Sequence, residues 1–141
     1  EGQSPAFIPN KAMRIIDGSD ITIIATGTLV SRALAAAAEL KAEGISARVI
    51  NLSTVSPLDT AEILAAAKET KAIITAEESV TRGGVGGAIA EFVVQNYPVP
   101  MKLMGIDTFA PTGSTTFLLE HFGLTSDSIV ASARELLKHG K

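Results

Sequence analysis

The residues with the clearest capacity for chemistry lie in one stretch, residues 76–92, which reads AEESVTRGGVGGAIAEF. It offers two neighbouring carboxylates, then a polar turn with Arg82 and four glycines in five positions, and then an apolar run typical of a helix. Backbone amides and the positive end of a helix dipole make such a turn suitable for a phosphate, and a guanidinium beside them would add a charge-assisted contact. The same glycines also fit a sharp turn that packs a strand against a helix.

The spacing of the glycines argues against the two common nucleotide motifs. A dinucleotide fingerprint needs G-x-G-x-x-G after the first strand, whereas Gly84 and Gly86 are followed by Ile89 where the third glycine belongs. A P-loop closes on Gly-Lys followed by Ser or Thr, and the chain has no such triplet. The remaining hypothesis is a loop that binds an anion or lies at an interface, formed by Glu77, Glu78, Ser79, Arg82, Gly83, Gly84, Gly86 and Gly87.

Glu77 and Glu78 are the candidates for acid–base chemistry, because open α/β sheets bind ligands at the ends of their strands. Neighbouring strand residues point to opposite faces, so at most one of the two can face a given cleft. A solvated strand end or an interface contact is the favoured interpretation of the pair, and a solvated turn residue or interfacial ion pair that of Arg82. His121 and His139 lack a triad-like context and are expected at a helix surface or helix end, and the chain has no HxH or HExxH spacing that would support a metal ligand.

The elements that must position this stretch follow from the apolar pattern. Unbroken β-branched runs predict buried strands, and Ala-rich periodic segments predict helices between them. Asp59 and Glu62 have capping-box spacing, and Thr125 is a cap for the last helix. The expected strands are 21–26, 47–52, 72–78 and 101–106, and the expected helices are 31–43, 60–70, 87–97, 115–121 and 126–139. Strands separated by helices favour a mostly parallel sheet in a three-layer α/β/α domain.

Composition and charge limit the remaining possibilities. A net charge of -3 without a Lys/Arg cluster argues against nucleic acid. No apolar run is long enough to cross a membrane, so we expect no membrane partner, and a chain without cysteine suits a soluble cytoplasmic protein. Residues 1–10 contain two prolines and read as an arm or linker, with one domain over 11–141. The start at Glu1 rather than Met indicates a trimmed start or a piece of a larger polypeptide.

Three segments in order carry a family resemblance. They are DGSDITIIATGTLVSRALAAAAELKAEG, then ARVINLSTVSPLDTAEI, then IITAEESVTRGGVGGAIAEF. Together they closely resemble the C-terminal domain of thiamine-diphosphate enzymes of the transketolase family, and the similarity runs from Lys11 onward. Related domains occur in deoxyxylulose-phosphate synthase and in the β-subunits of 2-oxo-acid dehydrogenases. The tail HFGLTSDSIVASARELL looks most like short or split transketolases, whereas Ser79 stands where many relatives carry His.

The resemblance implies a five-stranded mixed sheet whose first strand, about residues 11–16, is antiparallel to the others. It also implies that thiamine diphosphate and magnesium are held by upstream domains, through a GDG motif with a later Asn and an activating glutamate. This chain has no GDG motif, so we expect it to bind neither cofactor and to lack activity alone. The main role of the glycine turn is then to pack a strand end against the next helix, near a boundary with another domain or subunit.

The expected function is therefore the C-terminal section of a transketolase. It would support dimer assembly and the active-site surroundings during two-carbon ketol transfer between sugar phosphates, as in the pentose phosphate pathway. The expected partners are the upstream thiamine-binding domains or subunit, in a homodimer of the complete enzyme. Two alternatives stay open: the corresponding part of an oxo-acid dehydrogenase β-subunit or deoxyxylulose-phosphate synthase, and an anion- or nucleotide-binding regulatory module.

Overall fold

The structure, a computed structural model, describes residues 7–139. Within this range the chain forms β1 (Met13–Ile16), β2 (Ile21–Ala25), α1 (Leu29–Ala42), β3 (Ala47–Asn51), α2 (Thr60–Glu69), β4 (Ile73–Val80), α3 (Val85–Asn96), β5 (Met101–Ile106), α4 (Thr115–His121) and α5 (Ser126–His139). Every predicted strand and helix is present. β4 runs two residues beyond the predicted end and α3 begins two residues earlier than predicted. Residues 1–6 of the expected arm lie outside the described range, and the division at residue 11 stays a prediction.

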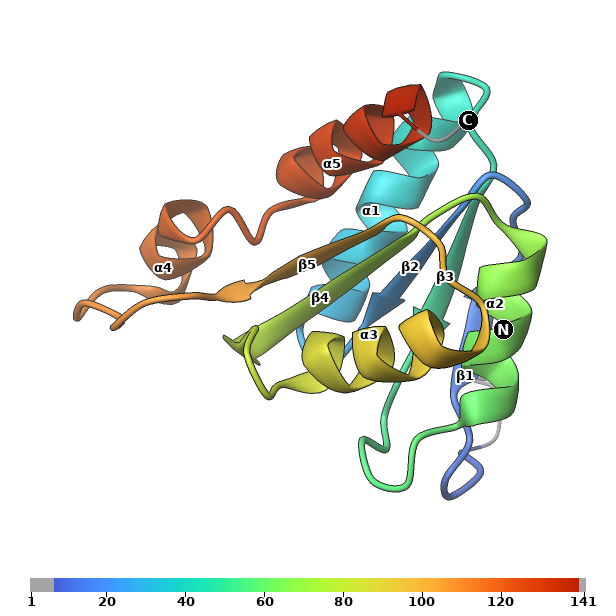
Figure 1. Ribbon diagram of the computed structural model, residues 1–141. Helices are drawn as coiled ribbons and strands as arrows, with labels where there is room; N and C mark the ends of the chain where they lie inside the picture. The colour runs from blue at the N-terminus through green and yellow to red at the C-terminus, as the bar shows by residue number, and fades with distance from the viewer. Residues whose placement is uncertain (1–6, 140–141) are drawn as a thin grey trace.

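The sheet has the strand order β1-β3-β2-β4-β5. β2 pairs in parallel with β3 and β4, and β5 pairs in parallel with β4. β1 is antiparallel to β3, as the family resemblance implied. Helices α1 and α5 cover one face of the sheet, and α2 and α3 cover the other (Figure 1). The three-layer α/β/α prediction is therefore confirmed.

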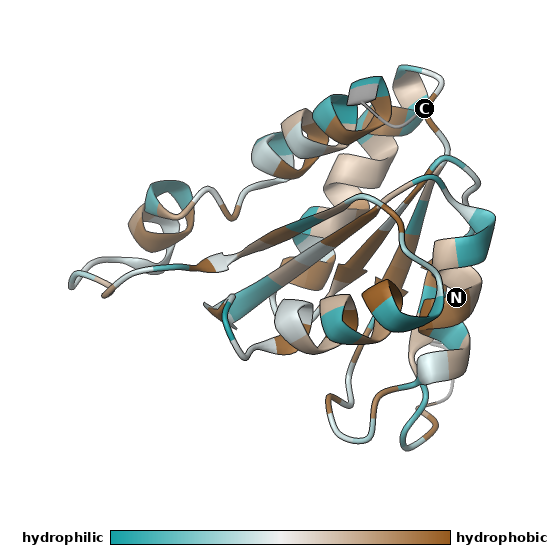
Figure 2. Ribbon diagram, viewed as in Figure 1, coloured by the Kyte–Doolittle hydropathy of each residue, from teal (hydrophilic) through white to brown (hydrophobic). Residues whose placement is uncertain are grey.

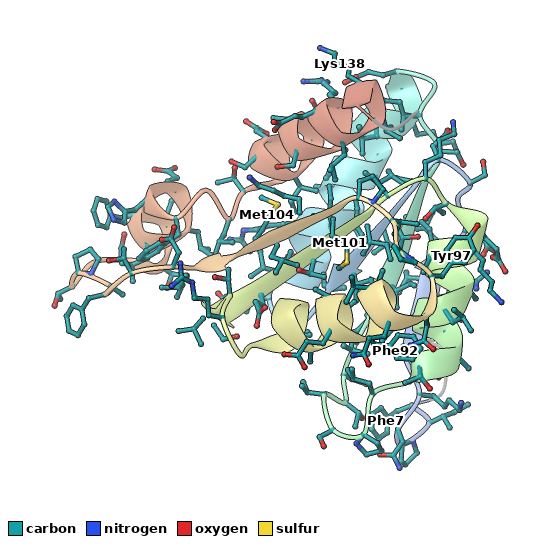
Figure 3. All side chains as sticks on the ribbon, in the orientation of Figure 1. Phe7, Phe92, Tyr97, Met101, Met104 and Lys138 are labelled. Atoms are coloured by element: carbon teal, nitrogen blue, oxygen red, sulfur yellow. The ribbon has the colours of Figure 1, made fainter. Side chains whose placement is uncertain are left out.

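Two apolar clusters hold the layers together. Side chains on β2 alternate between them: Ile21 and Ile23 face α1 and α5, and Ile24 faces α2 and α3. Figure 2 shows the result, with hydrophobic strands inside and hydrophilic outer helix faces. The edge strand β5 alternates in the same way, since Met104 belongs to the α1/α5 cluster and Met101 packs against the other (Figure 3). Within residues 7–139 no helix combines the length and the apolar character that crossing a membrane requires.

Capping residues fix the helix ends that the sequence predicted. Gly44 follows α1 with a φ of 80°, a left-handed conformation that favours glycine. The side chain of Thr125 accepts a hydrogen bond from the Ser128 amide at 3.2 Å at the start of α5. Asp59 accepts one from the Glu62 amide at 3.4 Å, but the Glu62 carboxylate pairs with the guanidinium of Arg14 at 2.8 Å. The capping box of α2 is therefore only half formed.

Candidate functional site

The glycine turn, residues 81–87, lies where β4 ends, at the carboxyl edge of the parallel strands. The pairing of β4 with β5 is irregular just before it: from Ala76 to Val80 along β4, the partner residue moves only from Met104 to Ile106. The additional residues of β4 lie between these pairs, and they include both candidate carboxylates. This irregularity gives Glu77 a conformation different from that of a residue in a regular ladder.

Glu77 is buried, with 1% of its surface exposed, and its carboxylate faces the start of α3. One carboxylate oxygen accepts a hydrogen bond from the Val85 amide at 2.8 Å, and the other accepts one from the Gly86 amide at 2.7 Å. The Ser79 hydroxyl donates to the same carboxylate. The interpretation of Glu77 as a solvated strand end or an interface contact is therefore wrong, because its side chain caps the positive end of α3 inside the domain.

Two positions of the turn require glycine, because atoms of β4 lie too close to leave room for a β-carbon. A β-carbon on Gly84 would lie 2.5 Å from the Glu77 carboxylate and would also collide with the Val80 carbonyl oxygen. A β-carbon on Gly86 would lie 2.5 Å from the hydroxyl oxygen of Thr75 on β4. Gly83 has a φ of 75°, in the left-handed region, and nothing lies within 4 Å of the place its β-carbon would take. These contacts let the start of α3 lie directly on the end of β4.

The other residues of the predicted loop have different surroundings. Glu78 points to the opposite side of β4 from Glu77, toward the turn at Gly27, and it is exposed. Ser79 is exposed as a residue, although its hydroxyl contacts Glu77. Arg82 is exposed and forms no hydrogen bond or ion pair with the side chains described in residues 7–139. The structure thus brings Glu77, Ser79, Gly84 and Gly86 together and leaves Glu78 and Arg82 at the surface.

A second carboxylate caps the start of α2 on the same edge. Asp59, 7% exposed, precedes α2 and accepts hydrogen bonds from the Ala12 and Glu62 amides, with Lys11 at 3.4 Å. Burial raises the pKa of Asp59, but these amides and the Lys11 ammonium outweigh burial, so the net pKa lies below its usual value. Asp59 also joins the segment before β1 to α2. The amides that begin α2 and α3 are therefore served by carboxylates of the chain itself.

The described residues do not fit thiamine diphosphate with its magnesium ion. Magnesium requires several oxygen ligands in octahedral geometry, and residues 7–139 contain no group of three or more His, Asp or Glu side chains that could hold a metal. Among residues 7–139, Asp59 and Glu77 are the buried carboxylates, and both oxygens of Glu77 already accept amide hydrogen bonds. Neither the Asp59 nor the Glu77 carboxylate therefore has a free oxygen that could bind the cofactor ring.

Sequence reasoning passed over the segment that follows β5. Residues 107–117 are exposed without interruption, and Phe109 is 95% exposed. The loop and α4 project beyond the rest of the domain (Figure 1). The sequence did carry a sign that this segment is an unusual surface loop, because residues 107–119, DTFAPTGSTTFLL, contain two phenylalanines and only one charged side chain, Asp107. A surface loop is ordinarily richer in charge.

Comparison with known proteins identifies relatives of the whole domain. The family model for "Transketolase, C-terminal domain" matches residues 10–129. A 6-deoxy-6-sulfo-D-fructose transketolase subunit of Clostridium sp. (strain MSTE9) is 42% identical over 137 residues, which cover 96% of this chain and 42% of that subunit. The 1-deoxy-D-xylulose-5-phosphate synthase of Heliobacterium modesticaldum (strain ATCC 51547 / Ice1) is 43% identical over 121 residues, 84% of this chain and 19% of the synthase.

A solved structure extends the likeness to three dimensions. A chain described as "Split gene transketolase, inactive beta4 tetramer" superimposes with a TM-score of 0.91 at 36% identity, covering 96% of this chain and 45% of that chain. The chain therefore spans less than half the length of the relatives it matches. The family model matches most of the chain and the fold agrees over 96% of it, and from this it follows that the chain belongs to the transketolase C-terminal domain family.

Proposed function

We propose that this chain is the C-terminal section of a transketolase that transfers two-carbon ketol units between sugar phosphates. The observation that supports the proposal is how much of each chain the alignments cover. The chain aligns over 96% of its length with 42% of a transketolase subunit and with 45% of a split-gene transketolase chain. The rest of such an enzyme would supply the thiamine-binding domains, and thiamine diphosphate would supply the carbanion chemistry there. This chain would contribute packing and surface.

The loop at the carboxyl edge is the part of the domain that we assign to the surroundings of the active site. Glu77 and the glycines hold the turn rigidly against β4 through the contacts described above. Arg82 on this turn and Glu78 near the end of β4 remain exposed, where they can form ion pairs with a neighbouring domain or subunit. The segment before β1 would connect residue 11 to the upstream portion, and the complete enzyme would be a dimer.

The alternatives receive less support. Five deoxyxylulose-phosphate synthases match 84–90% of this chain, whereas the transketolase subunit matches 96%. An anion-binding regulatory module would need unpaired amides at a helix start on the carboxyl edge. The amides that begin α3, next to the Arg82 turn, already bind Glu77, and those that begin α2 bind Asp59, which argues against an anion at either place; the start of α1, on the same edge, has no side-chain cap among the described residues.

Two measurements test the proposal. Calorimetry of the 141-residue chain with thiamine diphosphate and magnesium should show no binding, because no described residue group fits them. A ketol-transfer assay with sugar-phosphate donors should show turnover only when the thiamine-binding portion is present together with this chain. Turnover by the chain alone, full turnover by the thiamine-binding portion alone, or cofactor binding by the chain would each refute the proposal.

A further inference from the structure

The segment that projects beyond the sheet carries an apolar surface without a partner among residues 7–139. We call residues 107–121, the loop after β5 together with α4, the projecting arm. Phe109 in the loop is 95% exposed and Phe117 on α4 is 47% exposed. Val80, at the end of β4, pairs with Ile106 beside the arm and is 57% exposed. Large apolar side chains exposed in the arm and at the strand end beside it are typical of a contact surface.

The composition of the arm matches the centre of a protein interface. Such centres are enriched in aromatic residues and depleted in charge, while their rims are polar. Residues 107–119 contain two phenylalanines, five Ser or Thr hydroxyls and one charged side chain, Asp107. A loop that is exposed in the complete enzyme has no reason to exclude charge in this manner.

The second half of the arm, residues 113–121, is ordered by its own contacts. Ser114 caps α4 by accepting a hydrogen bond from the Phe117 amide at 3.2 Å. The rings of Phe117 and His121 stack with centroids 5.7 Å apart, and Phe117 lies so close to Gly113 that a β-carbon there would collide with the ring. This half of the arm therefore loses little conformational entropy on binding.

A hollow at the base of the arm shows what kind of surface would fit it. It has a volume of about 210 Å³ and is lined mainly by apolar side chains, including Ile106 at the end of β5, Leu118 on α4 and Phe122 just after α4. Glu78 is the carboxylate that lines it, and Glu78 has no ion pair among the described residues. The hollow can accept one apolar side chain with a basic or N–H group beside it.

We infer that the projecting arm is the docking surface for the thiamine-binding portion of the enzyme, with Phe109 buried in that portion and one of its apolar side chains in the hollow beside Glu78. The inference rests on the proposed function. The 137 aligned residues are 42% of the transketolase subunit, so about 190 of its residues lie outside the match. A globular unit of that size has a radius of gyration of about 16 Å, enough to cover an edge of five strands about 4.8 Å apart.

The place where the chain enters the domain supports the same occupant. Lys11 and Ala12 contact Asp59 at the start of α2, on the carboxyl edge of the sheet. The arm projects from this edge at its β5 end, and the glycine turn lies between the two. A single upstream unit lying along the edge would therefore meet all three.

The test compares one substitution in two contexts. Phe109→Ala should leave the thermal unfolding midpoint of the free 141-residue chain within about 1 °C, because a side chain that is 95% exposed has almost no contacts to lose. In the complete enzyme the same substitution should lower the midpoint by about 4 °C, as expected for a buried aromatic anchor. Val94→Ala is the matched control, since Val94 is 64% exposed on α3, and it should be silent in both contexts.

Hydroxyl-radical footprinting gives an independent reading. Oxidation of Phe109 should be about fivefold slower in the complete enzyme than in the free chain. Tyr97, which lies far from α4 and is 43% exposed, should change by less than about twofold (Figure 3). Equal oxidation of Phe109 in both contexts overturns the inference, as does a free chain that sediments as a dimer until Phe109 is replaced. Neither readout measures ketol transfer, so a complete enzyme that protects Phe109 but lacks that activity would refute only the proposed function.

Discussion

Glu77→Gln is the sharpest test of how the glycine turn is held. The carboxylate accepts the Val85 amide on one oxygen and the Gly86 amide on the other, at 2.8 and 2.7 Å. Glutamine has the same shape but only one acceptor oxygen, so in either orientation its NH2 group must face a backbone N–H. One amide at the start of α3 then loses its acceptor in a buried place, and the negative charge at the positive end of the helix is lost as well.

The magnitude follows from these two losses. A buried donor left without an acceptor costs about 1–3 kcal/mol. The interaction of a charge with a helix end adds about 0.3–1 kcal/mol at the surface and up to about 2 kcal/mol in partly buried geometry. We therefore expect Glu77→Gln to lower the free energy of unfolding by about 2–4 kcal/mol, a large share of the total for a domain of this size.

Urea unfolding followed by far-UV circular dichroism measures this difference, because the chain has no tryptophan and a single tyrosine to report by fluorescence. Glu78→Gln is the matched control: it removes the same charge one residue along, from an exposed side chain. The control should shift the free energy by less than about 0.5 kcal/mol. If the two variants unfold at the same urea concentration, the carboxylate of Glu77 does not hold the start of α3 and the reasoning fails.

Three further predictions concern neighbouring contacts. Gly86→Ala should lower the free energy of unfolding by about 1–3 kcal/mol, because its β-carbon would lie 2.5 Å from the Thr75 hydroxyl; a urea midpoint equal to wild type would contradict this. Thr75→Val should raise it by about 1 kcal/mol, because that buried hydroxyl has no hydrogen-bond partner within the described part of the chain, and a loss of stability by the same assay would show that the hydroxyl is satisfied. The folded pKa of Asp59 lies below its ordinary 3.8, so its stabilising effect is present above about pH 4 and lost as the pH falls through the folded pKa. Asp59→Asn should therefore flatten the decline of stability below about pH 4 in acid titrations, and an unchanged slope would rule this out.

The sheet could be predicted because its strands carry their own signal. Residues 21–25 are all buried, as an unbroken β-branched run on a sheet covered on both faces should be. The antiparallel pairing of β1 could not be derived in this way. Met13–Ile16 is short and only partly buried, so its direction followed from the family resemblance alone.

The candidate site was harder to predict because its key contact depends on an irregularity in strand pairing. The sequence shows that Glu77 and Glu78 point to opposite faces, and the structure has one buried and one exposed. It does not show which of them turns inward, since that depends on the shift of register between β4 and β5. The buried one is Glu77 because that face of β4 lies under the start of α3, where two amides need an acceptor.

The same geometry decides whether the glycine turn is a phosphate cradle. A helix start with free amides binds anions, but here Glu77 already occupies the place that an anion would take. Glu77→Ala should vacate it, and formate at a few times its dissociation constant should then recover about 0.5–1 kcal/mol of unfolding free energy, relative to chloride at equal ionic strength. The wild type should gain nothing from formate. An equal gain in the wild type would mean that the native turn still has an open anion site; no gain in Glu77→Ala would mean that its lost stability comes from the cavity rather than from unpaired amides.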